Sequence, residues 1–261
     1  MSREAKVCLL TGVGPGTGAA LAERFAAGGY KFAMLARDGE RLDAIAAAVP
    51  HTYPFPCDVA DETALEEVVA RVEDELGLIQ IVIHNAVSAN LTDFLDLKAE
   101  DLRRNFETNT IALLKLAQLT APGMIERGEG TILATGNTAA YRGKANFAGF
   151  APTKAAQRIL LESIARSAGP KGVHAVYVAI DAVIDVPWTR EAFKDKPESF
   201  FCKPGDIAAE CFHIAHQPRS TWSSDVVIRP YCETWEALTT SFPCRVASQP
   251  RRSRCCAVVC A

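Results

Sequence analysis

Eight residues near the N-terminus carry the clearest sign of chemistry in this chain. They read Thr-Gly-Val-Gly-Pro-Gly-Thr-Gly from Thr11 to Gly18, directly after an apolar run and at the start of a helical pattern. Glycines permit a tight turn and let backbone N–H groups approach a phosphate, while the helix N-terminus adds partial positive charge. We therefore predict a dinucleotide site rather than a plain turn, with a pyrophosphate cradle formed by Gly12, Gly14, Gly16, Thr17 and Gly18.

The residues that follow the second apolar run bear on the choice of cofactor. An NAD site needs a carboxylate at the strand tip to accept from the ribose 2′-hydroxyl, whereas a 2′-phosphate needs a cation. The tip is Ala36, followed by Arg37, and Asp38 lies past it, where we expect it to face solvent or begin a helix. We expect NADP(H) to be preferred, with NAD(H) as the alternative. The competing interpretation of Arg37 is an exposed salt bridge with a neighbouring acid.

These residues need a scaffold, and apolar patterning along the chain supplies one. Short β-branched runs alternate with stretches whose apolar residues recur every three or four positions. This alternation predicts a single-domain α/β fold, a Rossmann-type doubly wound parallel sheet. The expected strands cover 6–10, 32–36, 51–56, 79–84, 131–135, 173–180 and 225–229, and the expected helices 17–28, 40–49, 62–76, 99–127, 153–168 and 206–216.

Composition agrees with one globular domain. The 261 residues are 49% hydrophobic and carry a net charge of −3, without the basic excess typical of nucleic-acid binding. No apolar run is long enough to cross a bilayer, and a first strand near Lys6 leaves no room for a signal peptide. We expect a cytoplasmic protein whose partner is a small-molecule substrate, with neither a nucleic acid nor a membrane as partner.

Nine cysteines fall into two groups. Five are scattered, which is typical of reduced thiols in a cytosolic protein, and we expect Cys8 to fill the core. The other four crowd an arginine-rich segment, 236–261, which we interpret as a flexible or non-native tail after a domain spanning 1–235. The tail's alternative interpretation is a metal or partner site. His213 and His216 share a helix face without a third ligand, so no metal site is expected.

Further motifs resemble the short-chain dehydrogenase/reductase family from Lys6 to about Trp235. Cys57-Asp58-Val59 matches the family's Asp-Val pair, and His84-Asn85-Ala86-Val87 matches its Asn-Asn-Ala-Gly motif in two positions. The resemblance implies that Asp58, beside Val59, binds the adenine amino group and that Asn85 and Ala86 adjoin the cofactor. It also implies that Asn109 orders a proton-relay water.

The same resemblance implies a catalytic tetrad of Asn, Ser, Tyr and Lys, of which two members are changed. Lys154 falls on the lysine that holds the nicotinamide ribose, and four residues before it the expected tyrosine is Phe150. Thirteen residues earlier the expected serine is Asn137, which can donate a hydrogen bond but is no acid at neutral pH. Thr138 and Tyr141 are alternative hydroxyls, although Tyr141 is more typical of a packed or substrate-facing aromatic residue.

A last departure follows the sixth expected strand, where relatives carry Pro-Gly and a threonine that meets the nicotinamide carboxamide. Here only backbone groups of Ile184 are left for that contact, unless Thr189 moves in. The segment of about 183–203 carries four aromatic residues and is expected to cover the substrate as a mobile lid, which favours an apolar substrate.

Two functions are consistent with these residues. The first is an NADP(H)-dependent oxidoreductase with a non-standard proton donor, acting on a small apolar carbonyl, alcohol or activated alkene. The second is a catalytically silent NADP(H)-binding sensor or stabilising subunit. The apolar surface of the helix from Thr153, together with the family resemblance, predicts a homodimer or homotetramer.

Overall fold

Seven parallel strands form one sheet in the order β3-β2-β1-β4-β5-β6-β9. The structure is a computed structural model and describes residues 6–232. The predicted doubly wound sheet is confirmed, and each expected strand is present with its ends shifted by at most one residue. The strands are β1 (Val7–Thr11), β2 (Lys31–Ala36), β3 (Thr52–Pro56), β4 (Ile79–His84), β5 (Gly130–Gly136), β6 (Val173–Ile180) and β9 (Asp225–Ile228).

Burial explains why the central strands are apolar throughout. Every residue of β1 and of β6 is buried, because helices cover both faces of a parallel sheet. The prolines in β3 fit the same scheme. Pro54 and Pro56 lack a backbone donor, and β3 is an edge strand that needs hydrogen bonds on one side only.

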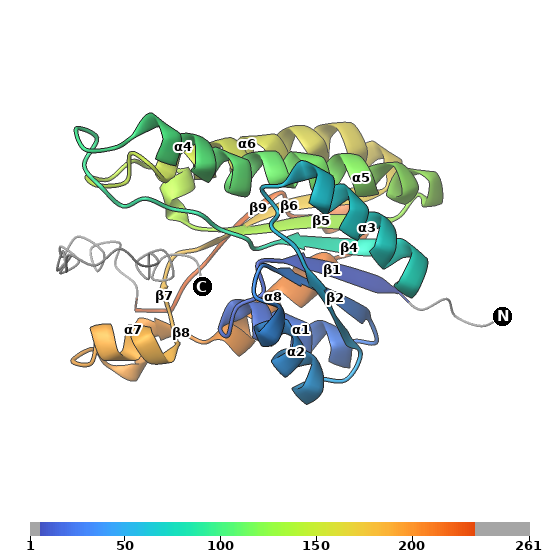
Figure 1. Cartoon of the computed structure of the whole chain (residues 1–261), viewed down its shortest axis with the longest axis horizontal. Coiled ribbons are helices and arrows are strands. Elements are labelled where there is room, and N and C mark those ends of the chain that lie inside the picture. Colours follow the sequence, from blue (N-terminus) through green and yellow to red (C-terminus); the bar gives the residue numbers. More distant parts are fainter. Residues whose placement is uncertain (1–5, 233–261) are drawn as a thin grey trace.

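Helices lie in two layers, one on each face of the sheet (Figure 1). Leu65, Leu113 and Leu161 from one layer pack into a single core cluster, and Leu21, Leu42 and Ile207 from the other layer pack into a second. The first layer contains α3 (Glu62–Leu76), α4 (Ala99–Phe106), α5 (Ala112–Arg127) and α6 (Ala151–Ala168), and the second α1 (Thr17–Ala27), α2 (Gly39–Ala48) and α8 (Pro204–Ala215).

The helix predicted over 99–127 is helical along its whole length, but it is not α-helical throughout. A π-helical turn, Glu107–Ile111, separates α4 from α5. Such a turn inserts an extra residue into the helical ladder, which apolar periodicity does not reveal, and it often occurs at functional sites. Asn109 lies within it.

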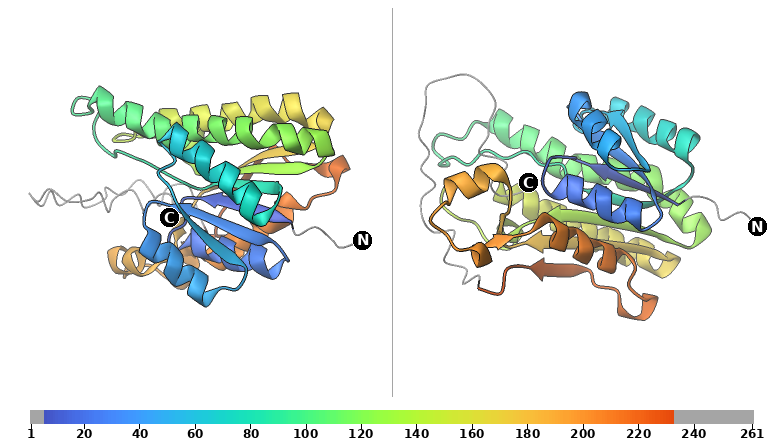
Figure 2. Two further views of the ribbon diagram at one scale, coloured as in Figure 1. Left: turned by 45° about the vertical axis from the view of Figure 1, so that its right-hand side comes forward. Right: turned by 90° about the horizontal axis from the view of Figure 1, so that it is seen from below.

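The segment after β6 leaves the main sheet and lies beside its carboxyl edge (Figure 2). It contains β7 (Val183–Ile184), α7 (Pro187–Ala192) and β8 (Phe201–Cys202), and β7 pairs with β8 in a small parallel sheet. Short 3-10 helices complete the fold: Thr138–Ala140, Gly169–Lys171, Glu198–Phe200 and Arg219–Thr221. The expected lid therefore has its own secondary structure.

Several expectations concern cysteines, membranes and the tail. The five cysteines within 6–232 are free thiols, and Cys8 is buried in the core as expected. Across the same residues no helix is both long and apolar enough to span a bilayer. The predicted end of the domain at 235 and the predicted tail 236–261 lie outside the described residues.

Candidate cofactor and substrate site

The glycine loop lies at the carboxyl end of β1, where the strand order reverses between β2 and β4. Ligands of doubly wound sheets bind at such a switch point. Gly12 has φ +77°, and a Cβ there would lie 2.4 Å from the backbone of Ala86. At Gly14, by contrast, a Cβ would meet nothing within 4 Å. Tight packing behind the loop and open space in front of it fit a pyrophosphate held by backbone N–H groups.

Arg37 and Asp58, the residues expected at the adenosine end of the cofactor, lie side by side. Arg37 Nη1 is 4.0 Å from Asp58 Oδ2, and the Arg37 side chain is 80% exposed. An exposed pair at this distance is weak, so it leaves Arg37 available to another anion. Asp38 caps α2 by accepting from the Arg41 N–H, as expected for a residue past the strand tip. Both interpretations of Arg37 are therefore compatible with its position.

The Asn85 side chain connects the glycine loop to the sheet by hydrogen bonds. Its Nδ2 donates to the Gly12 carbonyl (2.8 Å), and its Oδ1 accepts from the Thr135 hydroxyl (2.6 Å). The loop is also held by Leu35, whose carbonyl accepts from the Gly12 N–H at 2.8 Å. These contacts link three strand ends, so the cradle is a rigid part of the fold.

His84 lies beneath this cradle and is completely buried. One ring nitrogen pairs with the Thr11 hydroxyl (2.9 Å) and the other with the Thr108 carbonyl (3.1 Å), which joins β1 to the π-helical turn. Burial, and secondarily the charge of Lys154, lowers the pKa of His84 from 6.5 to about 3. The imidazole is thus neutral in the folded protein at physiological pH.

This pKa shift predicts acid sensitivity. Below about pH 6.5 the unfolded chain binds a proton at His84 that the folded chain refuses until about pH 3. The free energy of unfolding should therefore fall across that window, by about 1.4 kcal/mol per pH unit from this residue. His84→Asn should reduce the slope of unfolding free energy against pH, measured by urea unfolding beside the wild type. Equal slopes in the wild type and His84→Asn would contradict the assignment.

Lys154 is 1% exposed and belongs to a buried hydrogen-bond chain. Its Nζ donates to Gln157 Oε1 (2.9 Å) and to the Thr135 carbonyl (3.4 Å). Gln157 Nε2 in turn donates to the Asn109 carbonyl at 2.6 Å. A side-chain amide therefore connects the predicted lysine with the predicted asparagine. The Asn109 side chain accepts a hydrogen bond from the Ser88 N–H and donates one to the Ser88 carbonyl.

Phe150 lies next to Lys154, as the helical spacing predicts, but its surroundings are apolar. The lysine Nζ is 5.9 Å from the centre of the ring. The ring is fully buried and belongs to a small cluster with Ala89, Ala139 and Ala151. Phe150 is the N-cap of α6 and stands one helical turn before Lys154, with a ring that carries no proton-bearing group.

Asn137 follows β5 and caps the short helix Thr138–Ala140 by accepting from the Ala139 N–H. Behind it, the Tyr177 hydroxyl contacts both the N–H (3.2 Å) and the carbonyl (3.3 Å) of Asn137. This contact requires a glycine at 136, where a Cβ would lie 1.8 Å from the Tyr177 oxygen. Asn137 is therefore held in place through its backbone by a buried tyrosine.

The hydroxyl of Tyr141 is directed elsewhere. It donates to Asp225 at the start of β9, and the guanidinium of Arg158 lies over the ring at 5.0 Å. Desolvation raises its pKa above the ordinary value, and the bond to Asp225 adds to the effect. The structure thus joins Tyr141, which is 39% exposed, to β9 and α6.

Ile184 and Thr189 lie in one turn of the expected lid. The Thr189 hydroxyl is buried, donates to the Ile184 carbonyl (2.6 Å) and accepts from the Val186 N–H. The Ile184 carbonyl and the Thr189 hydroxyl, the two groups considered for the nicotinamide carboxamide, are thus hydrogen-bonded to each other. Arg190 ties the segment together, with two bonds to Asp185 and one ion pair to Glu198.

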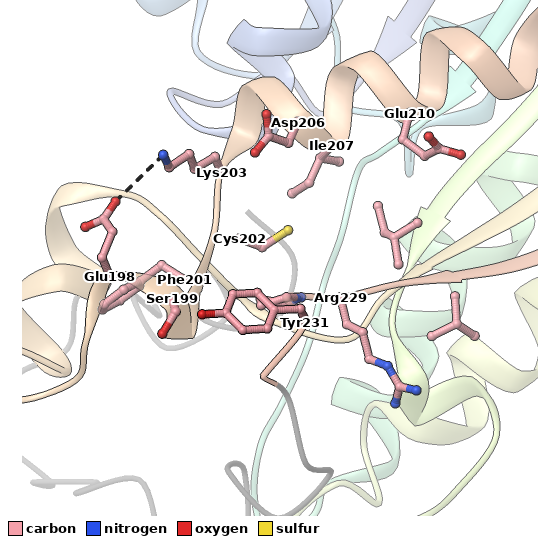
Figure 3. A pocket seen from close by; sticks show the side chains of 13 residues that line it. Glu198, Ser199, Phe201, Cys202, Lys203, Asp206, Ile207, Glu210, Arg229 and Tyr231 are labelled. Carbon is pink, nitrogen blue, oxygen red and sulfur yellow. Dashed lines mark ion pairs between the residues drawn. The ribbon is translucent and has the colours of Figure 1, made fainter.

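A hollow of about 690 Å³ opens between the base of this segment, α8 and β9 (Figure 3). Its lining includes Phe201 and Ile207 together with charged residues such as Lys203 and Arg229. None of the residues that the sequence assigned to catalysis or cofactor binding lines it. In the described part of the chain, no three His, Cys, Asp or Glu side chains come together as metal ligands.

Sequence reasoning missed three polar residues near the site. Gln157 stands one helical turn after Lys154, so its spacing was a usable signal. Asp181 follows an apolar strand at the carboxyl edge, which was a weaker one. Tyr177 lies within a continuously buried strand, and nothing in the sequence distinguishes it from core.

Comparisons with known proteins agree with this geometry. A model of the short chain dehydrogenase family matches residues 6–197. L-xylulose reductase of Mus musculus is 29% identical over 188 residues, 72% of this chain and 75% of its own. 7alpha-hydroxysteroid dehydrogenase of Escherichia coli (strain K12) is 25% identical over 237 residues, 86% of this chain and 92% of its own. A crystal structure of a short-chain dehydrogenase from Rhodopseudomonas palustris is 26% identical, with a TM-score of 0.75, and the match covers 88% of this chain and 100% of that one.

Proposed function

Because the chain belongs to the short-chain dehydrogenase family, we propose that it is an NADP(H)-dependent oxidoreductase whose proton donor is not the residue at position 150. Its substrate is a small carbonyl, alcohol or activated alkene with an apolar body. The single observation that carries the proposal is the fully buried Phe150 ring beside Lys154, at the end of an otherwise well-formed cofactor cradle.

The residues present fit a nicotinamide dinucleotide. The glycine loop and the N-terminus of α1 would hold the pyrophosphate, Asp58 the adenine and Lys154 the nicotinamide ribose. When bound, the nicotinamide supplies or accepts a hydride. The chain's own residues then position the substrate oxygen, and Lys154 contributes a fixed positive charge close to it.

The missing phenol sets the character of the reaction. Phenylalanine has no proton to donate, and Asn137 supplies a hydrogen bond rather than an acid. A positioned general acid contributes typically about 10²–10⁴-fold, so carbonyl reduction should be slow but not abolished. Alkene reduction should suffer least, because water can protonate the carbanion that hydride addition leaves.

Substrate-dependent oxidation of NADPH tests this function. A panel of small ketones, aldehydes and activated alkenes should include compounds that accelerate NADPH consumption, with alkenes foremost. Binding of NADPH without turnover of any compound would overturn the proposed reaction. It would leave the catalytically silent NADP(H)-binding sensor or stabilising subunit as the remaining function.

Arg37 should determine the preference for NADPH. A charge-assisted contact with the 2′-phosphate contributes about 1.5–3 kcal/mol, so Arg37→Ala should weaken NADPH binding about 10- to 100-fold and leave NADH binding unchanged. Arg41→Ala is the matched control, because Arg41 is paired with Asp38 at 2.9 Å. Equal losses for NADPH and NADH, measured by nicotinamide fluorescence, would show that Arg37 does not read the phosphate.

Assembly into a homodimer or homotetramer is part of the proposal. On α6, Ile159 is 48% exposed, and its apolar neighbours Ala155, Ala156, Leu160 and Ile164 are only half-buried. We expect sedimentation to give at least twice the monomer mass, and Ile159→Glu to shift the protein toward monomer. A wild-type monomer at micromolar concentration would contradict this expectation.

A further inference from the structure

One buried carboxylate near the site has no role in the reaction described so far. Asp181 is 2% exposed and follows the last residue of β6. Its N–H donates to the Ile228 carbonyl on β9 (2.9 Å), so the residue is fixed between two strand ends. It therefore lies at the carboxyl edge of the sheet, the edge at which doubly wound folds bind their ligands.

The two oxygens of Asp181 have different surroundings. Oδ1 accepts a hydrogen bond from the Thr138 hydroxyl at 2.6 Å, and Thr138 directly follows Asn137 in the sequence. Oδ2 is buried and has no hydrogen-bond partner. An unpaired buried carboxylate oxygen is costly, so such an atom calls for a functional explanation. Holding Thr138 in place does not provide one, because an asparagine oxygen would accept the same bond without burying a charge.

Arg142 lies beside Asp181 and forms an ion pair with it. Its Nη2 lies 4.0 Å from Asp181 Oδ1, on the side of the oxygen that Thr138 already contacts. The pair has no net charge, which favours a neutral hydrogen-bond donor at Oδ2 over a cation. An ionised carboxylate only accepts, so the matching group on a ligand is a hydroxyl.

We propose that Asp181 Oδ2 is the polar anchor of the substrate site and accepts a hydrogen bond from a hydroxyl group beside the reacting carbon. The substrate class is then a hydroxyketone or, in the reverse direction, a diol. This inference rests on the proposed oxidoreductase function and narrows it. A precisely placed polar acceptor of this kind fixes the orientation of a ligand, as binding sites commonly do.

The test compares hydroxyacetone with butanone in the wild type and in Asp181→Asn. The replacement keeps an oxygen for Thr138 and turns the Oδ2 position into a neutral N–H group. A ligand hydroxyl then loses the charge-assisted bond to a carboxylate and keeps at most an ordinary hydrogen bond. Thermal shift in the presence of NADP⁺ reports binding without turnover. We expect hydroxyacetone to bind the wild type about 10-fold more tightly than the variant, because a charge-assisted bond becomes an ordinary one, and butanone to bind both alike.

Asp225→Asn is the matched control, since it removes a carboxylate from the neighbouring strand that is bonded to Tyr141 and Arg158. It should leave hydroxyacetone binding unchanged. Equal hydroxyacetone binding by the wild type and Asp181→Asn would overturn the proposal. NADPH oxidation with the same compounds is measured separately. A protein that binds hydroxyacetone more tightly than butanone but oxidises no NADPH would contradict the proposed reaction and still support Asp181 as the anchor.

Discussion

Replacing Phe150 by tyrosine is expected to raise the rate of carbonyl reduction by about 10²–10⁴-fold, the usual contribution of a positioned general acid. The ring already lies 5.9 Å from the Lys154 ammonium, and the α6 backbone around it is regular. A phenol at this position would meet a fixed positive charge, which lowers the pKa of its hydroxyl and favours proton transfer. The measurement is NADPH oxidation with a fixed ketone, reported as kcat and KM.

Phe147→Tyr is the matched control for this gain. Phe147 is a partly buried neighbour whose ring centre lies 6.2 Å from that of Phe150, but it precedes α6. Its extra hydroxyl should leave the rate unchanged. If Phe150→Tyr binds NADPH normally and still shows no gain, then changes beyond position 150, such as Asn137 or the Gln157 bridge, limit the reaction.

Gly12→Ala should abolish NADPH binding and destabilise the fold. The left-handed backbone at Gly12 costs a residue with a side chain about 1–2 kcal/mol, and the new Cβ would lie 2.4 Å from backbone atoms of Ala86. That backbone belongs to the rigid link between β1 and β4, so it cannot yield cheaply. We expect more than a 100-fold loss of NADPH affinity and a fall in Tm of at least about 4 °C.

Gly14→Ala separates the two effects, because a Cβ there meets no protein atom within 4 Å. Its Tm should match the wild type, and any loss of NADPH affinity would report the space that the phosphate needs. Should Gly12→Ala keep both Tm and NADPH affinity, the loop would not be the tightly packed cradle described above.

Most of the fold could be predicted from patterns in the sequence. Continuous apolar runs predict buried parallel strands, and a glycine loop between strand and helix predicts the switch-point cradle. Even the two prolines of β3 are compatible with prediction, since an edge strand tolerates them. The π-helical turn at Glu107–Ile111 was not predictable, because apolar periodicity does not mark its extra residue. The turn is bonded to α6 through the Thr110 hydroxyl, which donates to the Thr153 carbonyl.

The site was predictable only where spacing along one element carries the information. Lys154 and Phe150 share a helical turn, so their proximity could be inferred. Contacts between elements could not, such as the Tyr177 hydroxyl behind Asn137 or the Thr138 hydroxyl on Asp181. Those pairs are 40 and 43 residues apart, and their register depends on the pairing of β5 with β6.

The most direct measurement is a titration of the purified protein with NADPH and, in parallel, with NADH, followed by nicotinamide fluorescence. The glycine cradle, Lys154 and the exposed Arg37 predict saturable binding of both nucleotides, with NADPH at least about 10-fold tighter. If neither nucleotide shows saturable binding, the result would contradict the proposed function and indicate that the glycine loop is only a structural turn.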